Sequence, residues 1–568
     1  MTSLASGRGR SFAYLAAGAA VAVLAVASLG HPGARAADAP GCAGDNGGLS
    51  LSPGFCASVV ADNLGHLRHL AMGPDGTIYA NTWSGMYYVG QPPPPGGFLV
   101  AIRPRGDGKA EVSRFGQTPA DGVAGGTGVA VYKGYVYAEV DDKIVRYKLP
   151  PGGNSPVGKT PEVVLSGMPL GGNHPMHPFV IDPKGQMFVD MGTATNACQG
   201  DDGDRKPDVM GLNPCTELET RGGTWKYDAN KLGQAFSPKE RYATGIRNGE
   251  GYAFDGAGRL YVTQHGRDQL PALWPKLYPD LKHATELPSE ELLMLTAGGD
   301  YGWPMCYHDP FQKKLVLAPE YGGDGGKAVG VCAQKTEPVA AYPAHWAPND
   351  LAFYTAKAFP GPYQGGAFIA FHGSWNRAPE PQAGFNVVFQ PMENGKATGA
   401  YIVFADGFTN SALRPTGLLP SPDGALYIAD DVKGRLWRVT YHGPAGLKTL
   451  AAAPAPKAVA AGGGAPLPVP PGSSAAQVAS GDKLYHSSSC AGCHGTAANG
   501  TPVGPDLTTG KYLWGDGSVA QLAATISGGV AMPKQYRQAM PPKGGAQLTD
   551  AQVKDVAAYV WALGHPGK

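Results

Sequence analysis

The chain has 568 residues, more than one ordinary domain contains, so at least two cores are expected. Its 46 basic side chains balance 45 acidic ones, which gives no electrostatic reason to expect nucleic acid as a partner. The 84 glycines and 52 prolines are mixed with Val, Ile, Tyr and Trp, a composition that favours many short strands and tight turns over disorder.

Residues 1–36 are predicted to be a signal peptide. Arg8 and Arg10 precede an apolar run at 12–29, and small residues at 34–36 suit cleavage. An uncleaved leader would instead anchor the chain in a membrane, because the run is almost long enough to span a bilayer. In both cases the rest of the chain lies outside the cytoplasm, and we expect it in the periplasm.

Six of the eight cysteines form neighbouring pairs along the chain. Disulfides between neighbours are typical of exported proteins, although other connectivities and free buried thiols are alternatives. A zinc site is disfavoured, because none of the six has the short spacing of zinc ligands. The predicted pairs are Cys42 with Cys56, Cys198 with Cys215, and Cys306 with Cys332.

A turn of Pro, Asp or Gly followed by a short alternating strand recurs along the first three quarters of the chain. Such a repeat favours a radial all-β architecture, most simply a six-bladed β-propeller over residues 45–443. A pair of β-sandwiches is the alternative. The six repeats are at 73–80, 132–140, 182–190, 255–263, 361–370 and 421–429.

Residues 444–475 consist almost entirely of Ala, Pro and Gly and are predicted to be an extended linker. In residues 476–568, Cys490-Ala491-Gly492-Cys493-His494 is a C-x-x-C-H motif, which predicts that Cys490 and Cys493 bind haem c covalently and that His494 binds the iron. These residues are therefore predicted to form a small all-α cytochrome c domain. A redox-active C-x-x-C is the alternative, but no βαβ pattern surrounds it.

The haem iron needs a sixth ligand, and two methionines are candidates. Residues 479–485 are predicted to end a first helix, and residues 549–563 to form the last helix, capped by Thr549. Met540 lies in a Met-Pro turn shortly before that last helix and is favoured over Met532. A thioether ligand raises the potential, which suits a haem that accepts electrons.

Several segments between residues 51 and 441 are distinctive in their order and context: GNHPMHPFVIDPKGQMFVDMGTATNACQ, GIRNGEGYAFD followed by YVTQHGRDQL, GGDYGWP, FIAFHGSWNR, and RPTGLLPSPDGALYIAD. Together they resemble the pyrroloquinoline quinone (PQQ)-dependent sugar dehydrogenases, a family that includes sorbosone, soluble glucose and pyranose dehydrogenases. The resemblance implies a six-bladed propeller that holds PQQ and Ca²⁺ at its mouth.

The resemblance also implies roles for single residues. His174 falls at the position of the family's catalytic base, with His177 as its rival; a neutral imidazole suits removal of a hydroxyl proton. The expected PQQ-binding residues are Arg247, Asn248, His372, Arg377 and Arg414, since PQQ carries three carboxylates and a quinone.

Gly266 and Arg267 match the turn whose backbone carbonyls bind the family's calcium. Trp303 is expected to pack within a blade, and His345 is a weaker candidate for the same pocket. The chain departs from the glucose dehydrogenases, which have an acidic residue at Thr193, a lysine at His372 and an arginine at Thr416. These differences place it nearer the sorbosone branch.

The expected function is oxidation of a sugar or aldehyde, an aldose or a 2-keto-aldose such as sorbosone, with electrons passing to the chain's own haem and then to an external cytochrome, quinone or oxidase. No nucleic acid partner is expected. One alternative is a haem-bearing carbohydrate-binding propeller without a quinone. Another is a calcium-dependent lactonase-type hydrolase.

Overall fold

The computed structural model describes residues 42, 44–82, 95–105, 109–116, 125–150, 160–200, 202–377, 380–408, 413–454, 467–488, 490–495, 498–501, 504–530, 532–535, 540–546 and 548–565. The predicted signal peptide at 1–36 and the centre of the predicted linker, 455–466, lie outside these residues. Within the described residues, no helix has the length and apolar character needed to cross a bilayer.

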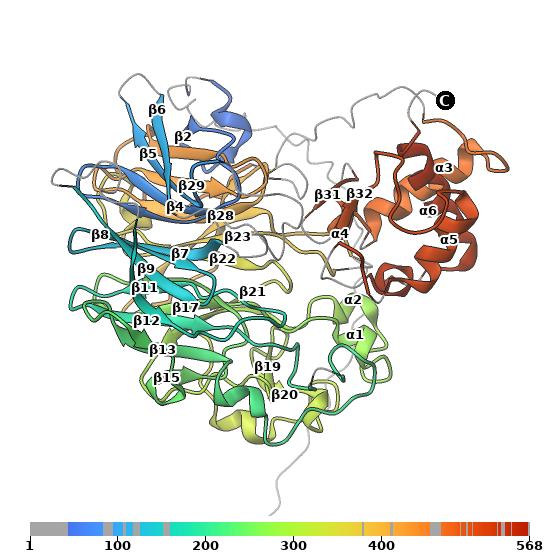
Figure 1. Ribbon diagram of the computed structural model, residues 1–568, viewed down its shortest axis with the longest axis horizontal. Coiled ribbons are helices and arrows are strands. Elements are labelled where there is room, and N and C mark those ends of the chain that lie inside the picture. The colour runs from blue at the N-terminus through green and yellow to red at the C-terminus, as the bar shows by residue number, and fades with distance from the viewer. Residues whose placement is uncertain are drawn as a thin grey trace, which may run out of the picture. The chain divides into compact units, whose positions relative to one another are not determined.

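Six antiparallel sheets, the blades of a β-propeller, form the larger part of the molecule (Figure 1). Each contains four main strands. The first three blades are β3 (Leu67–Met72), β4 (Ile78–Thr82), β5 (Leu99–Pro104) and β6 (Ala110–Phe115); β7 (Gly125–Tyr132), β8 (Tyr135–Val140), β9 (Lys143–Lys148) and β10 (Glu162–Ser166), with β14 (Gln234–Ala235) added at the edge; and β11 (Phe179–Ile181), β12 (Gln186–Met191), β13 (Gly223–Asp228) and β15 (Arg241–Thr244).

The last three blades follow the same plan. They are β16 (Gly249–Phe254), β17 (Leu260–Gln264), β18 (Glu290–Leu295) and β21 (Ala340–Tyr342); β22 (Pro348–Phe353), β23 (Ala367–Phe371), β24 (Asn386–Gln390) and β27 (Ile402–Asp406), with β1 (Ser50–Leu51) added; and β28 (Pro415–Pro420), β29 (Leu426–Asp430), β30 (Leu436–Tyr441) and β2 (Phe55–Ala61).

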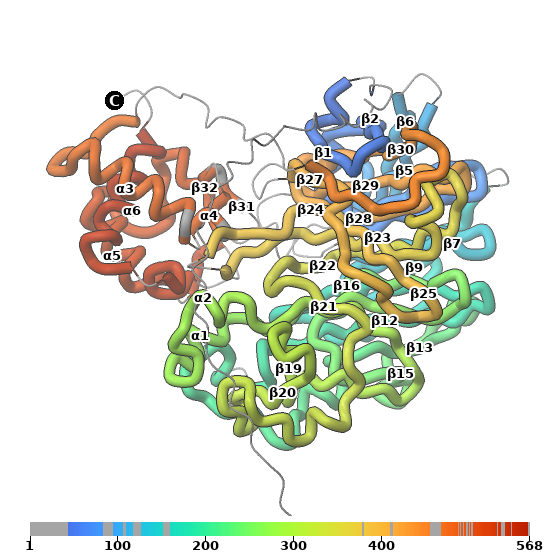
Figure 2. Tube along the Cα trace, turned by 180° about the vertical axis from the view of Figure 1, so that it is seen from behind, coloured from blue at the N-terminus to red at the C-terminus, as the bar shows by residue number. Residues whose placement is uncertain are grey.

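The blades close into a ring. Their first strands contact one another in the cyclic order β3, β7, β11, β16, β22, β28 and back to β3. The sixth blade takes its outer strand from the start of the propeller, since Phe55 of β2 pairs with Tyr441 of β30 (Figure 2). The six-bladed propeller expected from the sequence is therefore confirmed, and the β-sandwich alternative is wrong. Each of the six predicted repeats leads into the second strand of one blade: β4, β8, β12, β17, β23 and β29.

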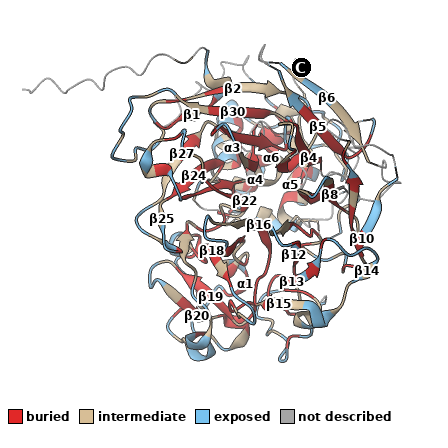
Figure 3. Ribbon diagram, turned by 90° about the vertical axis from the view of Figure 1, so that its left-hand side faces the viewer, coloured by how far each residue is buried: buried red, intermediate tan, exposed pale blue. Residues whose placement is uncertain are grey.

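Buried strands make up the cores of the blades, while the outer strand β10 carries exposed residues (Figure 3). Polar side chains join every blade to the next, which satisfies buried donors and acceptors and fixes the loops at the propeller mouth. The six bonds are Asn81 Nδ2 to Gly128 O, 3.0 Å; His177 N to Glu139 Oε1, 2.7 Å; Tyr252 OH to Asp190 Oδ1, 2.9 Å; Thr263 Oγ1 to Pro348 O, 2.9 Å; Leu418 N to Asp350 Oδ2, 2.7 Å; and Thr416 Oγ1 to Leu67 O, 2.8 Å.

All three predicted disulfides are present: Cys42–Cys56, Cys198–Cys215 and Cys306–Cys332. The last two close loops that extend from the third and fourth blades. Those loops also contain η2 (Thr216–Glu219) and the hairpin of β19 (Cys306–Asp309) and β20 (Lys314–Leu317). The loop between β17 and β18 contains α1 (Leu270–Leu273) and α2 (Leu281–Ala284), and a separate hairpin in the fifth blade consists of β25 (Met392–Glu393) and β26 (Lys396–Ala397).

The first part of the predicted linker differs from the expected free tether. Leu447 and Leu450 pack against the propeller core, and the backbone N–H of Ala453 donates to Val403 O at 2.7 Å. Apolar side chains within the Ala-rich stretch therefore hold its beginning against the fifth blade.

The C-terminal part is helical, as predicted, with α3 (Ala475–Ser487), α4 (Cys490–His494), α5 (Val519–Gly528), α6 (Asp550–Leu563) and a hairpin of β31 (Asn499–Thr501) and β32 (Gly504–Asp506). Reciprocal side-chain and backbone bonds between Ser474 and Gln477, and between Thr549 and Gln552, cap α3 and α6. The predicted cap of the last helix is thus confirmed. Val553, Val556, Ala557 and Val560 are buried on its inner face.

Candidate cofactor sites

His174 lies in the segment that leads into β11, against the end of β12. Its backbone approaches Gly192 so closely that a Cβ there would lie 2.6 Å from His174 O and 2.7 Å from His174 Cβ. A glycine at 192 is therefore required for this placement. The loop that carries the candidate base is packed directly on a rigid strand end.

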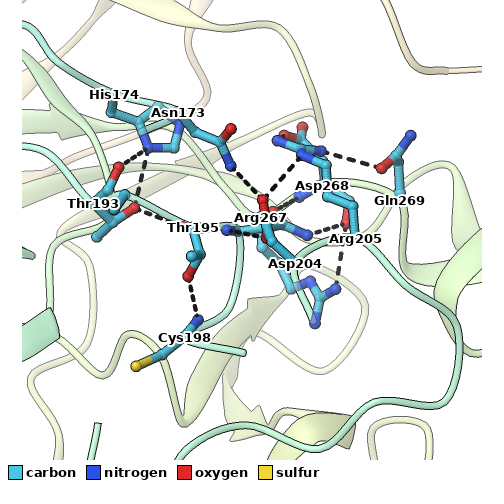
Figure 4. A network of polar contacts seen from close by, with 12 residues as sticks. Asn173, His174, Thr193, Thr195, Cys198, Asp204, Arg205, Arg267, Asp268 and Gln269 are labelled. Carbon is cyan, nitrogen blue, oxygen red and sulfur yellow. Dashed lines mark hydrogen bonds and ion pairs between the residues drawn. The ribbon is translucent and has the colours of Figure 1, made fainter. Parts of the chain in front are cut away.

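The His174 imidazole has one nitrogen bonded and one available. Nδ1 lies 3.0 Å from both the carbonyl and the hydroxyl oxygen of Thr193 (Figure 4), and no group in the described part of the chain bonds Nε2. Burial, and then the positive charge of Arg247, hold the pKa of His174 well below its ordinary value. A neutral imidazole with an available nitrogen can accept a proton.

His177 is placed very differently. Its ring is buried, Nε2 lies 3.1 Å from Pro169 O, and Nδ1 lies 3.5 Å from Glu139 Oε1. Because its backbone N–H also bonds Glu139, this residue joins the second blade to the third. The geometry gives His177 a structural role and leaves His174 as the candidate base.

Arg247 follows β15 and belongs to a buried cluster around Asp268. Asp268 Oδ2 lies 2.9 Å from Nη2 of both Arg247 and Arg205. Burial opposes ionisation of this carboxyl, but Arg247 and Arg205 outweigh it and hold the pKa of Asp268 below its ordinary range. Arg247 is only 3% exposed, so it is part of the site and not a surface charge.

Asn248 lies two residues before a second buried acid, Glu250. The Oε2 atom of Glu250 lies 3.9 Å from Arg68 Nη2, and the backbone carbonyl of Asn248 accepts from His265 N at 3.0 Å. Burial raises the pKa of Glu250 to about 7, against the opposing effect of Arg68. Asn248 therefore links the Arg247 loop to the polar centre of the propeller.

His372 and Arg414, from the fifth and sixth blades, form a matching cluster. His372 Nε2 lies 2.9 Å from both carboxylate oxygens of Asp431, which also accepts from Arg68 at 3.0 Å. Arg414 Nε donates to His372 O at 3.0 Å. Burial, and then Arg414, lower the pKa of His372 to about 4.

The two clusters have the same charge balance, and Asn376, four residues after His372, contacts the Asp268 cluster. The surroundings of His174 and of His372 each contain two arginines and one aspartate, an excess of positive charge. Asn376 Nδ2 donates to Asp268 Oδ1 at 2.8 Å, while its buried Oδ1 bonds no group of the described chain. Nearby, Trp346 Nε1 and Gln382 Nε2 are also buried without a partner among the described residues. Buried donors and acceptors of this kind suit a polar, polyanionic ligand such as PQQ.

Backbone strain gathers around the same loops. Positive φ angles occur at Gln269 (63°), His345 (65°), Ala347 (57°) and Phe385 (52°), none of them glycine. Such conformations persist only where the surrounding structure enforces them, and they cluster at functional sites. The mouth loops are therefore held in a defined arrangement.

Three of the other sequence candidates are occupied by protein contacts. Arg377 pairs with Glu286 and donates to Ala344 O at 2.9 Å. Trp303, expected to pack within a blade, instead packs beside the Cys198–Cys215 disulfide and donates to Asn196 O at 3.1 Å. His345 is buried near Asp268, and burial lowers its pKa to about 4.

The residues present fit a calcium ion poorly. Gly266 O already accepts from Arg247 Nη1 at 2.8 Å, and the Arg267 side chain pairs with Glu320. The described residues contain no group of three acidic, histidine or cysteine side chains that could hold a metal ion. A hard divalent cation prefers six to eight oxygens, so most ligands would have to come from elsewhere.

The residues of the C-terminal part fit haem well. Cys490, Cys493 and His494 border a cavity whose walls are mostly apolar. His494 Nδ1 lies 3.0 Å from Pro505 O, so that the carbonyl accepts its N–H and Nε2 is left for a metal. Other lining residues are Tyr485, Leu507, Leu522, Ile526, Val530, Met540, Val556 and Val560.

The two methionine candidates differ sharply in position. Met540 lines the cavity, and its backbone pairs with Val530 through bonds of 2.7 and 3.0 Å. Met532 is 84% exposed. The structure therefore brings Met540, and not Met532, to the haem cavity.

Sequence reasoning missed four partners of these sites: Asp268, Asp431, Arg205 and Asn376. Asp268 lies in the motif that contains Gly266 and Arg267, and Asn376 directly precedes Arg377 in the segment FIAFHGSWNR, so both follow strands in loops where polar residues are often functional. Arg205 and Asp431 have no distinguishing local signal, because only the fold brings them to these sites.

Fold and sites together define a propeller with a polar, positively charged mouth, joined to a small haem-binding helical domain. The chain belongs to the TrAA12-like family, whose model matches residues 49–442, and residues 478–564 match a cytochrome c family. The expected kinship with PQQ-dependent sugar dehydrogenases fused to cytochrome c is confirmed.

Curated relatives cover the two parts separately. A PQQ-dependent pyranose dehydrogenase of Coprinopsis cinerea is 27% identical over 229 residues, 34% of this chain and 30% of the relative. The cbb3-type cytochrome c oxidase subunit FixP of Rhizobium etli is 42% identical over 77 residues, 13% of this chain and 26% of the relative. The chain thus spans half or less of the length of the curated relatives it matches.

A solved structure of a family AA12 carbohydrate-active enzyme from Trichoderma reesei shares the propeller fold. Its TM-score is 0.55 at 17% identity, over 69% of this chain and 98% of that one.

Proposed function

We propose that the chain is an exported quinohaemoprotein dehydrogenase that oxidises a sugar or sugar-derived aldehyde in the periplasm. The supporting observation is a neutral imidazole, His174, with Nε2 available, surrounded by groups of net positive charge, on a chain that also carries a haem motif beside an apolar cavity. We assign residues 1–36 to the leader, 45–443 to the propeller, 444–475 to the linker and 476–568 to the cytochrome.

The residues of the propeller mouth would hold the cofactor by charge and hydrogen bonding. Arg247, Arg414 and His372 carry donors suited to the three carboxylates of PQQ, and Asn248 supplies an amide. Arg377 contributes less directly, because its guanidinium already pairs with Glu286. Calcium binding at Gly266 and Arg267 would depend on oxygens supplied by the cofactor itself.

When bound, the quinone would accept the hydride of the substrate carbon, and the haem would carry the two electrons away singly. His174 Nε2 takes the hydroxyl proton of the substrate, which turns that carbon into a carbonyl. Cys490, Cys493, His494 and Met540 would hold the haem. The substrate class is an aldose or a 2-keto-aldose such as sorbosone, and the acceptor an external cytochrome, quinone or oxidase.

The full-length haem protein tests this proposal when it is incubated with PQQ and Ca²⁺ and then mixed with candidate aldoses and 2-keto-aldoses. The absorbance of reduced haem should rise only when quinone and sugar are both present. A chain that takes up no PQQ under these conditions is not a dehydrogenase of this kind and would be a carbohydrate-binding propeller. Acid release from lactones without any acceptor would identify a hydrolase.

A further inference from the structure

The hydrogen bonds around His174 have a direction that follows from chemistry alone. Thr193 Oγ1 donates to Thr195 O at 2.9 Å, because a carbonyl oxygen only accepts. A hydroxyl has one proton, so the Thr193 hydroxyl has none left for His174 and meets the imidazole as an acceptor. The Thr193 carbonyl, also 3.0 Å from Nδ1, is an acceptor as well. Two acceptors therefore face Nδ1, which must carry the proton.

We infer that Thr193 is a positioning residue that fixes the Nδ1–H tautomer of His174 and thereby leaves the lone pair of Nε2 to act on substrate. The inference rests on the proposed function for its catalytic meaning. It extends that function by naming an uncharged partner of the base, at the position where the glucose dehydrogenases have an acid.

Thr193 is itself held from both sides. Its backbone N–H donates to Arg247 O at 2.9 Å, which ties it to the arginine loop. On the other side, the carboxylate of Glu217 accepts from Ala194 N at 2.8 Å and from Thr195 N at 3.2 Å, and it also accepts the Thr195 hydroxyl. The direction of the bond to His174 is thus set by buried backbone groups that cannot reorient.

A disulfide completes this support. Cys198 N donates to Thr195 Oγ1 at 2.9 Å, and Cys198 is joined to Cys215, directly before the short helix η2 that carries Glu217 (Figure 4). The segment from Thr193 to Cys198 and the helix that holds it are therefore one covalently closed unit. Thr193 is 0% exposed within it.

Because Thr193 is uncharged, it does not stabilise the protonated form of His174. The charged groups that act on the imidazole are Arg247 and Arg205, which disfavour its protonation, and Asp268, which favours it; His265 is neutral, because burial lowers its pKa to about 3. No carboxylate bonds Nδ1 to stabilise an imidazolium. The base therefore releases its proton readily, and turnover should persist in acid solution.

The first test measures the tautomer directly by ¹⁵N NMR of the full-length protein, without PQQ, labelled only in its 14 histidines. The His174 signal, identified by its absence in His174→Gln, should show Nδ1 protonated and Nε2 as a lone pair. His265 is an internal control of opposite tautomer, since its Nε2 lies 3.2 Å from Pro348 O. An Nε2–H tautomer at His174 would overturn the inference.

The second test changes the partner. Thr193→Val keeps the β-branched shape and the carbonyl but removes the hydroxyl; we expect a detectable Nε2–H population and a kcat about five- to tenfold lower at unchanged KM. Thr193→Ser should restore both. Thr193→Asp should move the acidic limb of the pH–kcat profile up by about one to two units. Wild-type behaviour in the Val and Asp variants would exclude a role for this side chain.

The two proposals fail in different ways. If the tautomer is as expected but no sugar reduces the haem, the dehydrogenase proposal fails and the Thr193 contact stands. If sugars reduce the haem while His174 carries its proton on Nε2, only the positioning role is lost.

Discussion

The haem pocket and the propeller mouth solve the problem of holding a redox cofactor in opposite ways. The haem pocket is an apolar cavity whose chemistry is concentrated in five consecutive residues, Cys490–His494. The propeller mouth is polar, and its groups come from loops of four blades, from His174 to Asp431. In the first, covalent bonds and burial of apolar area supply the binding energy. In the second, a network of paired charges must be complete before a ligand arrives.

The contrast teaches that the contiguous haem motif tolerates changes in the residues around it. The network of the propeller mouth, whose members are far apart in the sequence, depends on each charged partner. Around each histidine, Asp268 or Asp431 offsets one of two arginine charges, so the loss of either acid would leave two positive charges unbalanced. The predictions below separate the two regions and then probe each one alone.

The largest effect is expected from Cys490→Ala/Cys493→Ala. Covalent haem should be lost completely, because no other thiols are placed at the cavity in the described chain. A haem stain on a denaturing gel measures this loss, and the unfolding of the propeller should not change. Cys198→Ala/Cys215→Ala is the matched control, and it should keep its haem. Retained covalent haem in the first variant would refute the motif assignment.

The next largest effect concerns the candidate base. His174→Gln should lower kcat by roughly 10²- to 10⁴-fold, because the hydroxyl proton of the substrate loses its acceptor. PQQ uptake and the haem spectrum should remain as in the wild type. His177→Gln is the control, since that ring faces Pro169 O and Glu139; its rate should stay near wild type even if its stability falls. A fully active His174→Gln variant would exclude His174 as the catalytic base.

A third prediction tests the network. Asp268→Asn leaves the buried Arg247 without its counter-charge, while Arg205 keeps Asp204 at 3.9 Å, and it should lower the free energy of unfolding of the propeller by about 3 kcal/mol. Because the pKa of Asp268 is depressed in the fold, its contribution is present above the unfolded pKa of about 3.9 and is lost as pH falls through the folded value. The difference between variant and wild type should therefore shrink below about pH 4.

Denaturant titrations at several pH values measure this difference. Asp423→Asn, which breaks the exposed pair with Arg438, serves as the control and should cost less than about 1 kcal/mol. Equal costs for the two substitutions would show that the buried cluster contributes nothing special to stability.

The smallest effect is a change of potential in the haem pocket. Met540→Ala should lower the midpoint potential by on the order of 0.1 V, because a thioether ligand favours the reduced iron. Met532→Ala, at a side chain 84% exposed, should leave the potential unchanged. A redox titration that found the reverse would assign the sixth ligand to Met532.

The sequence allowed the overall architecture and the haem region to be predicted because their signals are local. Each propeller repeat is a turn and the strand that follows it, so a few residues suffice to find β4 or β29. The disulfides were found for the same reason, since Cys42 and Cys56 are near neighbours. The cap at Thr549 and the motif ending at His494 also lie within single turns of helix.

The propeller mouth could be predicted only in part. Resemblance to a family pointed to His174 and Arg247, but nothing local indicated that Arg205 would meet Asp268, or that Arg68 of the first blade would meet Asp431 of the sixth. Arg377 illustrates the limit: its partner Glu286 is 91 residues away, so the sequence could not show that its charge was already matched. The packing of Leu447 and Leu450 on the fifth blade was not predicted, because the Ala, Pro and Gly residues around them are typical of an extended linker.

The pairing of β2 with β30 also dictates the order in which the molecule is put together. β2 is synthesised early, yet its partner is made last in the propeller; Arg435 Nη1 and Gly47 O, which bond at 3.2 Å, are 388 residues apart. Until β30 emerges, β2 presents an unpaired edge that could join another copy of the chain. All six blades must therefore be synthesised before the propeller can close, and the cysteines that would bind the porphyrin are synthesised only after that.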